Sequence, residues 1–162
     1  MTAGRTTTTT NSADETLALG RLLGRCLEPG DVIALVGPLG AGKTCLVKGV
    51  VAGMGLKDTR RVVSPTYLLI KEYEARLHVY HVDAYRLNTA SELLHLGFDE
   101  MCAAGGVILI EWADRIAAAL PPERLDIRLA LAPGTQRRLT FQPHGEPYQR
   151  LAETLAADAP DS

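Results

Sequence analysis

The sequence has few cysteines and no long apolar run, and each shortage excludes a class of protein. Cys26, Cys45 and Cys102 are widely spaced and form no CxxC pair, so neither a disulfide framework nor a zinc site is indicated. Such sparse cysteine use is typical of the reducing cytoplasm. No stretch approaches the roughly 20 apolar residues of a transmembrane helix, and the N-terminus lacks the apolar core of a signal peptide. We therefore expect a cytoplasmic protein that contacts no membrane.

A strong excess of charge is also missing. The net charge is −2 over 162 residues, whereas proteins that grip nucleic acid by neutralising phosphates usually have a clear basic excess. Aromatic residues make up only 5% of the chain, and no aromatic and basic platform for stacking bases is visible. A direct RNA-binding module is therefore the least favoured function, although weak contact with tRNA through a complex stays open.

The length and composition predict one folded domain with short tails. A chain of 162 residues that is 46% apolar is typical of a single globular domain. The stretch TTTTT near the N-terminus shows no apolar pattern, so we expect residues 1–11 to be a disordered tail. Residues 159–162 are expected to be a loose C-terminus. Residues 12–158 then form the domain.

Local patterns predict alternating strands and helices. The apolar runs 32–36 and 107–110 predict strands buried on both faces, as in a parallel sheet. The runs 66–73 and 77–85 are separated by three residues, which predicts an antiparallel hairpin. Helices are expected to begin at Ser12, Lys43, Ser91 and Tyr148, and further strands at Leu125 and Arg137. The prediction is an α/β fold with a mixed, partly parallel central sheet and antiparallel hairpin additions.

The strongest motif follows the first apolar strand. The stretch GPLGAGKT, Gly37 to Thr44, matches G-x-x-x-x-G-K-[ST] in full. Glycines let several backbone N–H groups point into one concavity, and the next helix adds the positive end of its dipole. A flexible glycine-rich turn is the less favoured alternative, because the motif stands between a strand and a helix. The predicted phosphate-binding residues are Gly37, Leu39, Gly40, Ala41, Gly42, Lys43 and Thr44.

Two carboxylates are candidates for metal binding or catalysis beside this loop. Glu111 ends the apolar strand 107–110, which is the Walker B position, so Thr44 and Glu111 are the predicted magnesium ligands. Asp83 lies between apolar residues on a predicted strand, where a carboxylate needs a partner or a function. It is either a second acid that orients water or the ion, or the partner of a cation such as Arg86. The nearby His78 and His81 fall on opposite faces of this strand, so we assign them structural roles.

Four further blocks complete a pattern. SPTY begins at residue 64, VYHVDAYRL at 79, LGFDE at 96 and ILIEW at 108. With GPLGAGKT, their order and spacing resemble the bacterial TsaE family over roughly residues 12–138.

The resemblance implies a function as well as a fold. It implies a P-loop NTPase-like three-layer sandwich that binds ATP and Mg²⁺ and acts as a slow ATPase. In that family the ATPase is required for threonylcarbamoyl modification of the tRNA adenosine beside the anticodon. It does not transfer the group itself, but acts on a complex of TsaB and TsaD. TsaD-like and TsaB-like proteins are thus the implied partners, and tRNA is contacted only indirectly.

The same resemblance implies roles for single residues. Asp83 corresponds to an acid implicated in hydrolysis, alongside Lys43 at the phosphates, and Thr66 to a switch threonine near the γ-phosphate. Trp112 follows the metal acid and is expected in a moving segment. Arg138 corresponds to a basic position near the nucleotide, although Arg137 beside it leaves that choice open. The start of the first helix is expected to border the adenine.

Two other functions stay open. A small-molecule P-loop kinase needs an acceptor pocket and usually an arginine-rich lid, and the arginines at 60, 61 and 115 make no convincing lid. A scaffold that binds ATP without meaningful hydrolysis is the second alternative, which substitution of Asp83 would distinguish.

Overall fold

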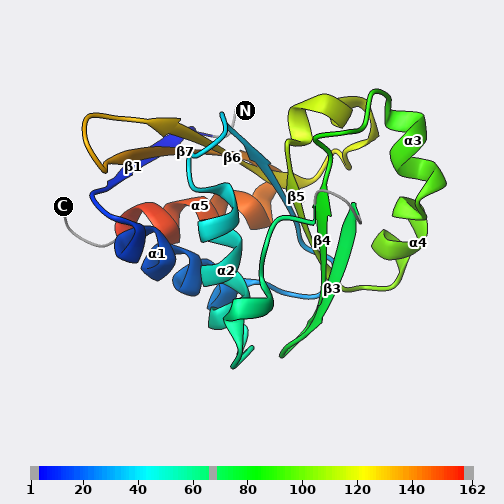
Figure 1. Cartoon of the computed structure of the whole chain (residues 1–162), viewed down its shortest axis with the longest axis horizontal. Helices are drawn as coiled ribbons and strands as arrows, with labels where there is room; N and C mark the ends of the chain where they lie inside the picture. The colour runs from blue at the N-terminus through cyan, green and yellow to red at the C-terminus, as the bar shows by residue number, and fades with distance from the viewer. Residues whose placement is uncertain (1–3, 66–68, 159–162) are drawn as a thin grey trace.

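A computed structural model of the chain describes residues 4–65 and 69–158 and contains one seven-stranded sheet (Figure 1). The strands are β1 (Thr6–Thr10), β2 (Val32–Val36), β3 (Ile70–Glu74), β4 (His78–Asp83), β5 (Val107–Glu111), β6 (Arg124–Leu131) and β7 (Arg137–His144). The helices are α1 (Ala13–Cys26), α2 (Lys43–Gly53), α3 (Ala90–His95), α4 (Phe98–Ala103) and α5 (Glu146–Ala157), with the 3₁₀ segments η1 (Thr59–Arg61) and η2 (Ala113–Ala119).

The sheet is mixed, as predicted. Its strand order is β1-β7-β6-β2-β5-β4-β3. The neighbours β6, β2, β5 and β4 run parallel, while β3, β7 and β1 add antiparallel pairs at the two sides. The apolar strands β2 and β5 lie side by side at the centre, where both faces of the sheet are covered. The predicted hairpin is β3 and β4, although residues 66–68 of its first run lie outside the described residues.

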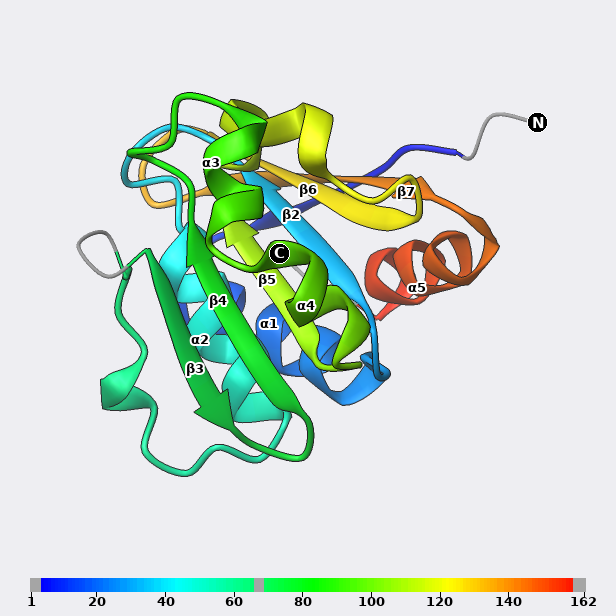
Figure 2. The same ribbon diagram turned by 90° about the vertical axis from the view of Figure 1, so that its right-hand side faces the viewer.

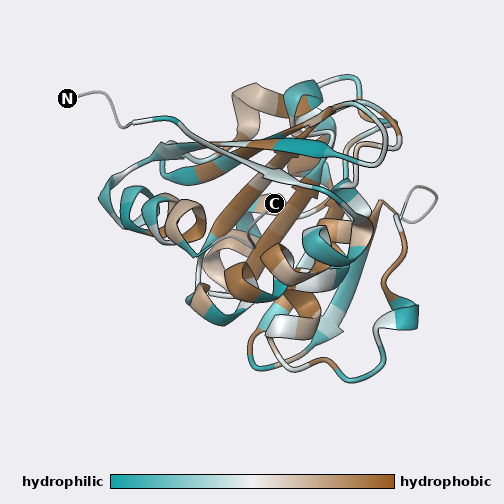
Figure 3. Ribbon diagram, turned by 90° about the vertical axis from the view of Figure 1, so that its left-hand side faces the viewer, coloured by the Kyte–Doolittle hydropathy of each residue, from teal (hydrophilic) through white to brown (hydrophobic). Residues whose placement is uncertain are grey.

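Helices cover both faces of the parallel half of the sheet. In Figure 2, α3 and α4 lie in front of β4 and β5, and α1 and α2 lie behind them. The two sides enclose separate apolar cores, one around Leu23 and Val47 and the other around Leu93 and Phe98. Figure 3 shows the central strands as the hydrophobic middle of these layers. The three-layer sandwich is therefore confirmed.

The helices α1 and α2 approach each other backbone to backbone. A Cβ atom on Gly24 of α1 would lie 2.1 Å from the carbonyl oxygen of Val50 in α2. A Cβ on Gly49 of α2 would lie 2.4 Å from the carbonyl oxygen of Leu17. Only glycine fits at both positions, and the tight contact fixes the direction of α2. This helix begins within the predicted phosphate-binding motif, residues 37–44, called the phosphate loop below.

The prediction of a disordered N-terminal tail is wrong for Thr6–Thr10. These residues form β1, an edge strand paired antiparallel with β7 from Thr6 opposite Phe141 to Thr10 opposite Arg137. Threonine favours extended backbone because it branches at Cβ, and β7 supplies the hydrogen-bonding edge. Residues 1–3 and the predicted loose C-terminus, 159–162, lie outside the described residues. Among the residues described, every helix is too short or too polar to cross a lipid bilayer.

Candidate phosphate-binding site

The phosphate loop joins the end of β2 to the start of α2 at the carboxyl edge of the parallel strands. Gly42 caps α2 with φ 103° and Gly40 has φ 80°, which are left-handed conformations that glycine adopts without steric cost. A Cβ on Gly37 would lie 2.4 Å from the carbonyl oxygen of Leu129 in β6. The first N–H groups of α2 have no acceptor inside the helix, so they and the helix dipole favour an anion at this end.

A cavity of about 480 Å³ opens beside this loop. Its walls come from the loop, from the ends of β4 and β5 and from the segment before residue 66. The lining residues are Leu39, Gly40, Gly42, Lys43, Thr44, Cys45, Ser64, Asp83, Tyr85, Glu111 and Trp112. The loop lysine and threonine and both predicted acids therefore reach one cavity, although they are up to 68 positions apart in the chain.

Lys43 lies folded across the mouth of the loop. Its Nζ donates to the carbonyl oxygens of Gly37 at 2.6 Å and Pro38 at 2.9 Å. The ammonium lies 4.0 Å from the centroid of the Trp112 ring, a cation–π distance. Burial lowers the pKa of Lys43, and the nearby carboxylates of Glu111 and Asp83 partly oppose this effect. A buried cation is thus held where phosphate oxygens would meet it.

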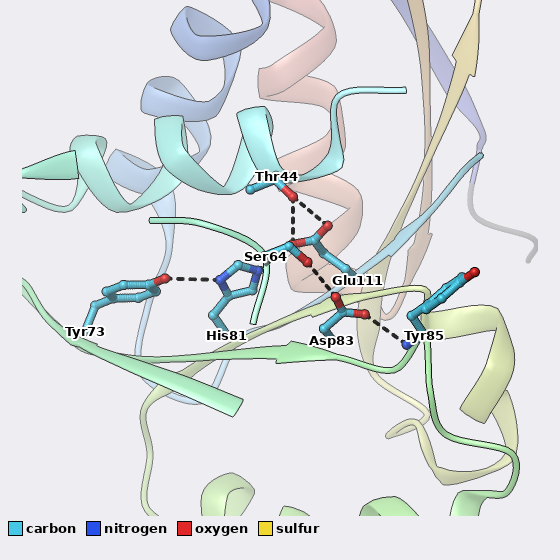
Figure 4. Close-up of polar contacts among 7 residues, drawn as sticks. All are labelled: Thr44, Ser64, Tyr73, His81, Asp83, Tyr85 and Glu111. Atoms are coloured by element: carbon cyan, nitrogen blue, oxygen red, sulfur yellow. Dashed lines mark hydrogen bonds and ion pairs between the residues drawn. The ribbon is translucent and has the colours of Figure 1, made fainter. Parts of the chain in front are cut away.

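Thr44 and Glu111 contact each other directly (Figure 4). The Thr44 hydroxyl donates to the two Glu111 carboxylate oxygens at 2.9 and 3.1 Å. Glu111 is 2% exposed, so its charge depends on such partners. The remaining partner is His81, whose Nε2 lies 2.6 Å from Glu111 Oε2. The sequence patterns predicted only a structural role for His81, although residues two apart on a strand, such as His81 and Asp83, share a face.

Asp83 lies next to Glu111, because these residues are paired across β4 and β5. The Ser64 hydroxyl donates to Asp83 Oδ2 at 2.5 Å, and the Tyr85 backbone N–H donates to Oδ1 at 2.9 Å. Asp83 is 1% exposed. Ser64 belongs to the block SPTY, but its contact with Asp83 was not predicted. Parallel pairing thus puts two acids side by side at the strand ends.

Trp112 closes the cavity on the side of η2. It has φ 58°, a left-handed conformation that costs a residue with Cβ about 1–2 kcal/mol. Its ring contacts Lys43 and lies 5.0 Å from the Tyr85 ring, with 56° between the ring planes. The Arg115 guanidinium lies 5.1 Å from the Tyr85 ring on the same side. Trp112 is thus a strained residue that contacts the loop lysine, and its place in a moving segment stays a prediction.

A second cavity, of about 280 Å³, lies on the other side of the loop. Its lining residues are Ala13, Thr16, Gly40, Gly42, Cys45, Thr135 and Arg137. Arg137 donates to the carbonyl oxygen of Gly40 at 3.3 Å. Arg138 is exposed and opposite Thr9 in β1, and neighbours along a strand point to opposite faces. The structure therefore favours Arg137 over Arg138 as the basic residue at the loop.

The donor set fits a magnesium ion that a nucleotide brings with it. Thr44 and Glu111 offer hard oxygen ligands, with Asp83 beside them. In the described part of the chain, no three side chains of His, Cys, Asp or Glu form a group that could hold a metal ion alone. Mg²⁺ typically binds one or two carboxylates together with phosphate oxygens and water, so this sparse protein set is suitable.

Three predicted site residues remain, of which two lie in the described part of the chain and one does not. Leu39 and Ala41 both belong to the loop, Leu39 exposed at its tip and Ala41 buried beneath it. Thr66 lies outside the described residues, so its role as a switch stays a prediction.

The chain is similar to known proteins along most of its length. Residues 10–139 match the family model described as threonylcarbamoyl adenosine biosynthesis protein TsaE. The chain belongs to the TsaE family. A relative named tRNA threonylcarbamoyladenosine biosynthesis protein TsaE, from Bacillus subtilis (strain 168), is 44% identical over 91% of each chain. Its namesake from Treponema pallidum (strain Nichols) is 40% identical over 80% of this chain and 94% of its own.

A solved structure is similar along nearly the whole chain. The crystal structure of YdiB from Bacillus subtilis has a TM-score of 0.82 and 37% identity, and 97% of each chain is covered. The similarity in fold therefore extends beyond residues 10–139, which the family model matches.

Proposed function

We propose that this TsaE-family chain is a magnesium-dependent ATPase of tRNA threonylcarbamoyladenosine synthesis. Its substrate is ATP, and its action is on a complex of TsaB-like and TsaD-like proteins rather than on the threonylcarbamoyl group. The relatives' names support the pathway. The observation that carries the ATPase is the convergence of Lys43, Thr44, Asp83 and Glu111 on one cavity beside the phosphate loop.

Binding would depend on the loop and on the two cavities beside it. The amides at the start of α2 and the ammonium of Lys43 would neutralise the phosphate oxygens. The cavity lined by Ala13, Thr16 and Arg137 would take the nucleoside. Thr44 and Glu111 would hold Mg²⁺, which supplies a Lewis acid that stabilises charge developing on the phosphate oxygens.

Asp83 would act on the water. Its carboxylate is anchored by the Ser64 hydroxyl and the Tyr85 amide, so its position is fixed before substrate binds. From there it would orient a water in line with the γ-phosphorus and accept its proton. The water oxygen would bond to the γ-phosphorus while the bond from the γ-phosphorus to the bridging oxygen breaks, which gives ADP and phosphate. Ser64 would thus serve as a positioning residue for Asp83.

Coupling to partners would use the segments around the cavity. Trp112 contacts Lys43 and Tyr85 and immediately precedes η2. Movement of the lysine side chain towards phosphate would therefore change the contacts that position η2. Thr66, which lies outside the described residues, is proposed as the switch threonine. Among the described residues that line the larger cavity there is no arginine, so hydrolysis by the isolated chain is expected to be slow, and the partner complex would order or complete the site.

The test separates binding from hydrolysis. Lys43→Ala should weaken ATP affinity in calorimetry about 10–100-fold, because it removes a charge-assisted contact to phosphate. Asp83→Asn should retain ATP binding but reduce the rate of ATP hydrolysis about 10²–10⁴-fold, which is the rate enhancement that a positioned base contributes. Lys48→Ala in the same helix and Asp126→Asn on β6 are matched controls and should behave as the parent.

The outcomes also distinguish the alternatives. Binding without turnover, even with purified TsaB and TsaD homologues present, would leave a nucleotide-dependent scaffold. Phosphate transfer to a small acceptor, with little release of free phosphate, would indicate a kinase. Loss of threonylcarbamoyladenosine formation with Asp83→Asn in the reconstituted system would support the pathway assignment.

A further inference from the structure

A buried histidine lies behind the candidate metal acid. His81 is fully buried, at 0% exposure. Its Nε2 lies 2.6 Å from Glu111 Oε2, and its Nδ1 lies 3.3 Å from the hydroxyl oxygen of Tyr73 on β3 (Figure 4). Both ring nitrogens therefore have partners, and the imidazole cannot turn without breaking two buried contacts.

With Glu111 ionised and His81 neutral, the side chains of Tyr73, His81 and Glu111 can donate in one direction only. An ionised carboxylate can only accept, so His81 Nε2 carries the hydrogen towards Glu111. The Nδ1 of the neutral ring then accepts, and the Tyr73 hydroxyl donates to it. Burial raises the pKa of Tyr73 to about 12, so this hydroxyl keeps its proton near neutral pH. The network thus selects one tautomer of His81.

Thr44 and His81 donate to the Glu111 carboxylate from different elements, and its two oxygens accept different numbers of hydrogen bonds. Thr44, from α2, bridges Oε1 and Oε2, whereas His81, from β4, bonds Oε2 alone. Oε1 therefore keeps more acceptor capacity than Oε2. A carboxylate fixed in this way presents one chosen oxygen to a ligand in the cavity.

We propose that His81 is a positioning residue that holds the Glu111 carboxylate in the orientation needed for magnesium, with Tyr73 fixing the imidazole. The inference rests on the proposed function, because it takes Glu111 as a ligand of the nucleotide-bound ion. Partners that orient a metal ligand in this manner typically change metal affinity about 10–100-fold when they are removed.

The purely structural alternative predicts a different result. His81 sits within the ladder between β4 and β5, opposite Leu109, and that pairing uses only backbone atoms. If His81 merely filled space, leucine would replace it without affecting the metal. If the Nε2–H group is what matters, glutamine, whose amide nitrogen reaches a similar position, would restore the effect that leucine loses.

The experiment measures binding rather than turnover. Binding of a fluorescent ATP analogue is followed as Mg²⁺ is titrated, and again in excess EDTA. His81→Leu should raise about 10–100-fold the Mg²⁺ concentration that gives half of the maximal Mg²⁺-dependent binding of the analogue. The affinity for the analogue in EDTA should stay nearly unchanged. His81→Gln should recover most of the loss, and Tyr73→Phe should give a smaller shift in the same direction.

His78→Gln is the matched control. His78 lies on the same strand but on the opposite face, where it contacts Glu72 and Glu74 at the surface, so its Mg²⁺ titration should match that of the parent. Thermal unfolding checks that each variant is folded. Should His81→Leu not fold, the comparison of His81→Gln, Tyr73→Phe and the parent still decides the matter.

Three results would overturn the inference. These are a parental Mg²⁺ titration in His81→Leu, equal losses for leucine and glutamine, and an equal loss of affinity in EDTA, since the last would indicate general damage to the loop. If the parent itself binds the analogue with no dependence on Mg²⁺, the proposed function fails, and this inference fails with it.

Discussion

At the scale of single residues, two sets of buried polar groups illustrate how this protein keeps such groups inside the fold. One is the network of His81, Glu111 and Thr44 at the cavity. The other is Tyr148 on α5, whose hydroxyl oxygen accepts the backbone N–H of Val32 at 3.0 Å. The second contact anchors α5 to the start of β2, the strand that leads into the phosphate loop. Each is a case of a polar group that can be buried only because it has a partner.

Tyr148 should make the stability of the protein sensitive to alkali. Burial, chiefly, raises its pKa from 10.0 to about 12. Because the folded pKa is higher than the unfolded pKa, the stabilisation is fully present below pH 10.0 and is lost as the pH rises towards about 12. The loss amounts to about 2–3 kcal/mol, since one pKa unit corresponds to about 1.4 kcal/mol.

Urea unfolding, read by circular dichroism, measures how the free energy of unfolding depends on pH. The measurements run from about pH 9 to about pH 12, which spans the unfolded and folded pKa values of Tyr148. Tyr148→Phe should make the decline in the free energy of unfolding less steep, and the remaining decline is expected from Tyr73, whose pKa burial also raises to about 12. Tyr85→Phe is the control, because Tyr85 is 46% exposed. An equally steep decline in Tyr148→Phe would mean that other groups cause the alkaline loss.

At the scale of elements, the close contact between α1 and α2 determines where the phosphate loop lies. The glycines of α1 and α2 allow the two helices to touch backbone to backbone, and Ser12 caps α1 by accepting the Glu15 N–H at 3.2 Å. The strand β1 runs directly into this cap, where the Thr10 and Thr16 hydroxyls lie 2.7 Å apart. β1 is thus connected through α1 to α2 and the phosphate loop.

Removal of β1 should therefore destabilise the whole domain. A chain that begins at Asn11 would leave the edge of β7 unpaired and lose the buried contact of Thr10. A loss of about 2 kcal/mol would lower the melting temperature by about 4–8 °C for a domain of this size. A chain that begins at Gly4 retains the strand and is the matched control. Equal melting temperatures of the two chains would show that β1 contributes nothing to stability.

At the scale of the whole molecule, the site is assembled from elements that are distant in the sequence. The loop and α2, the ends of β4 and β5, and η2 meet only when the sheet is complete. Because a ligand that binds only this assembled state stabilises the fold as a whole, the proposed ATP binding is linked to global stability. The linkage gives a test that needs no partner protein and no turnover.

Mg·ATP should raise the melting temperature of the protein. At a concentration of about 100 Kd the gain is about 2.7 kcal/mol, which corresponds to roughly 5–10 °C. Scanning fluorimetry should show a smaller shift with ATP in EDTA and at most about half of the parental shift for Lys43→Ala, whose affinity is about 10–100-fold weaker, while Lys48→Ala should behave as the parent. A full shift in Lys43→Ala would contradict the placement of the phosphates at the loop.

Local patterns in the sequence were enough to predict most of the elements and the place of the loop between a strand and a helix. Strands β2 and β5 are continuous apolar runs, and burial on both faces requires just that composition. The loop motif is local too, because its glycines, Lys43 and Thr44 act within eight consecutive residues. Glu111 could be predicted as a candidate because a parallel strand ends there.

Only the tertiary structure decided the contacts that depend on how strands pair. β1 has no apolar pattern of its own, and its partner β7 lies about 130 residues away in the sequence. The contact of His81 with Glu111 follows from the register of β4 and β5, and the choice of Arg137 over Arg138 follows from which face of β7 meets the loop. A sequence records periodicity and local preference, whereas strand order and register are set by which edges and apolar faces meet in the folded chain.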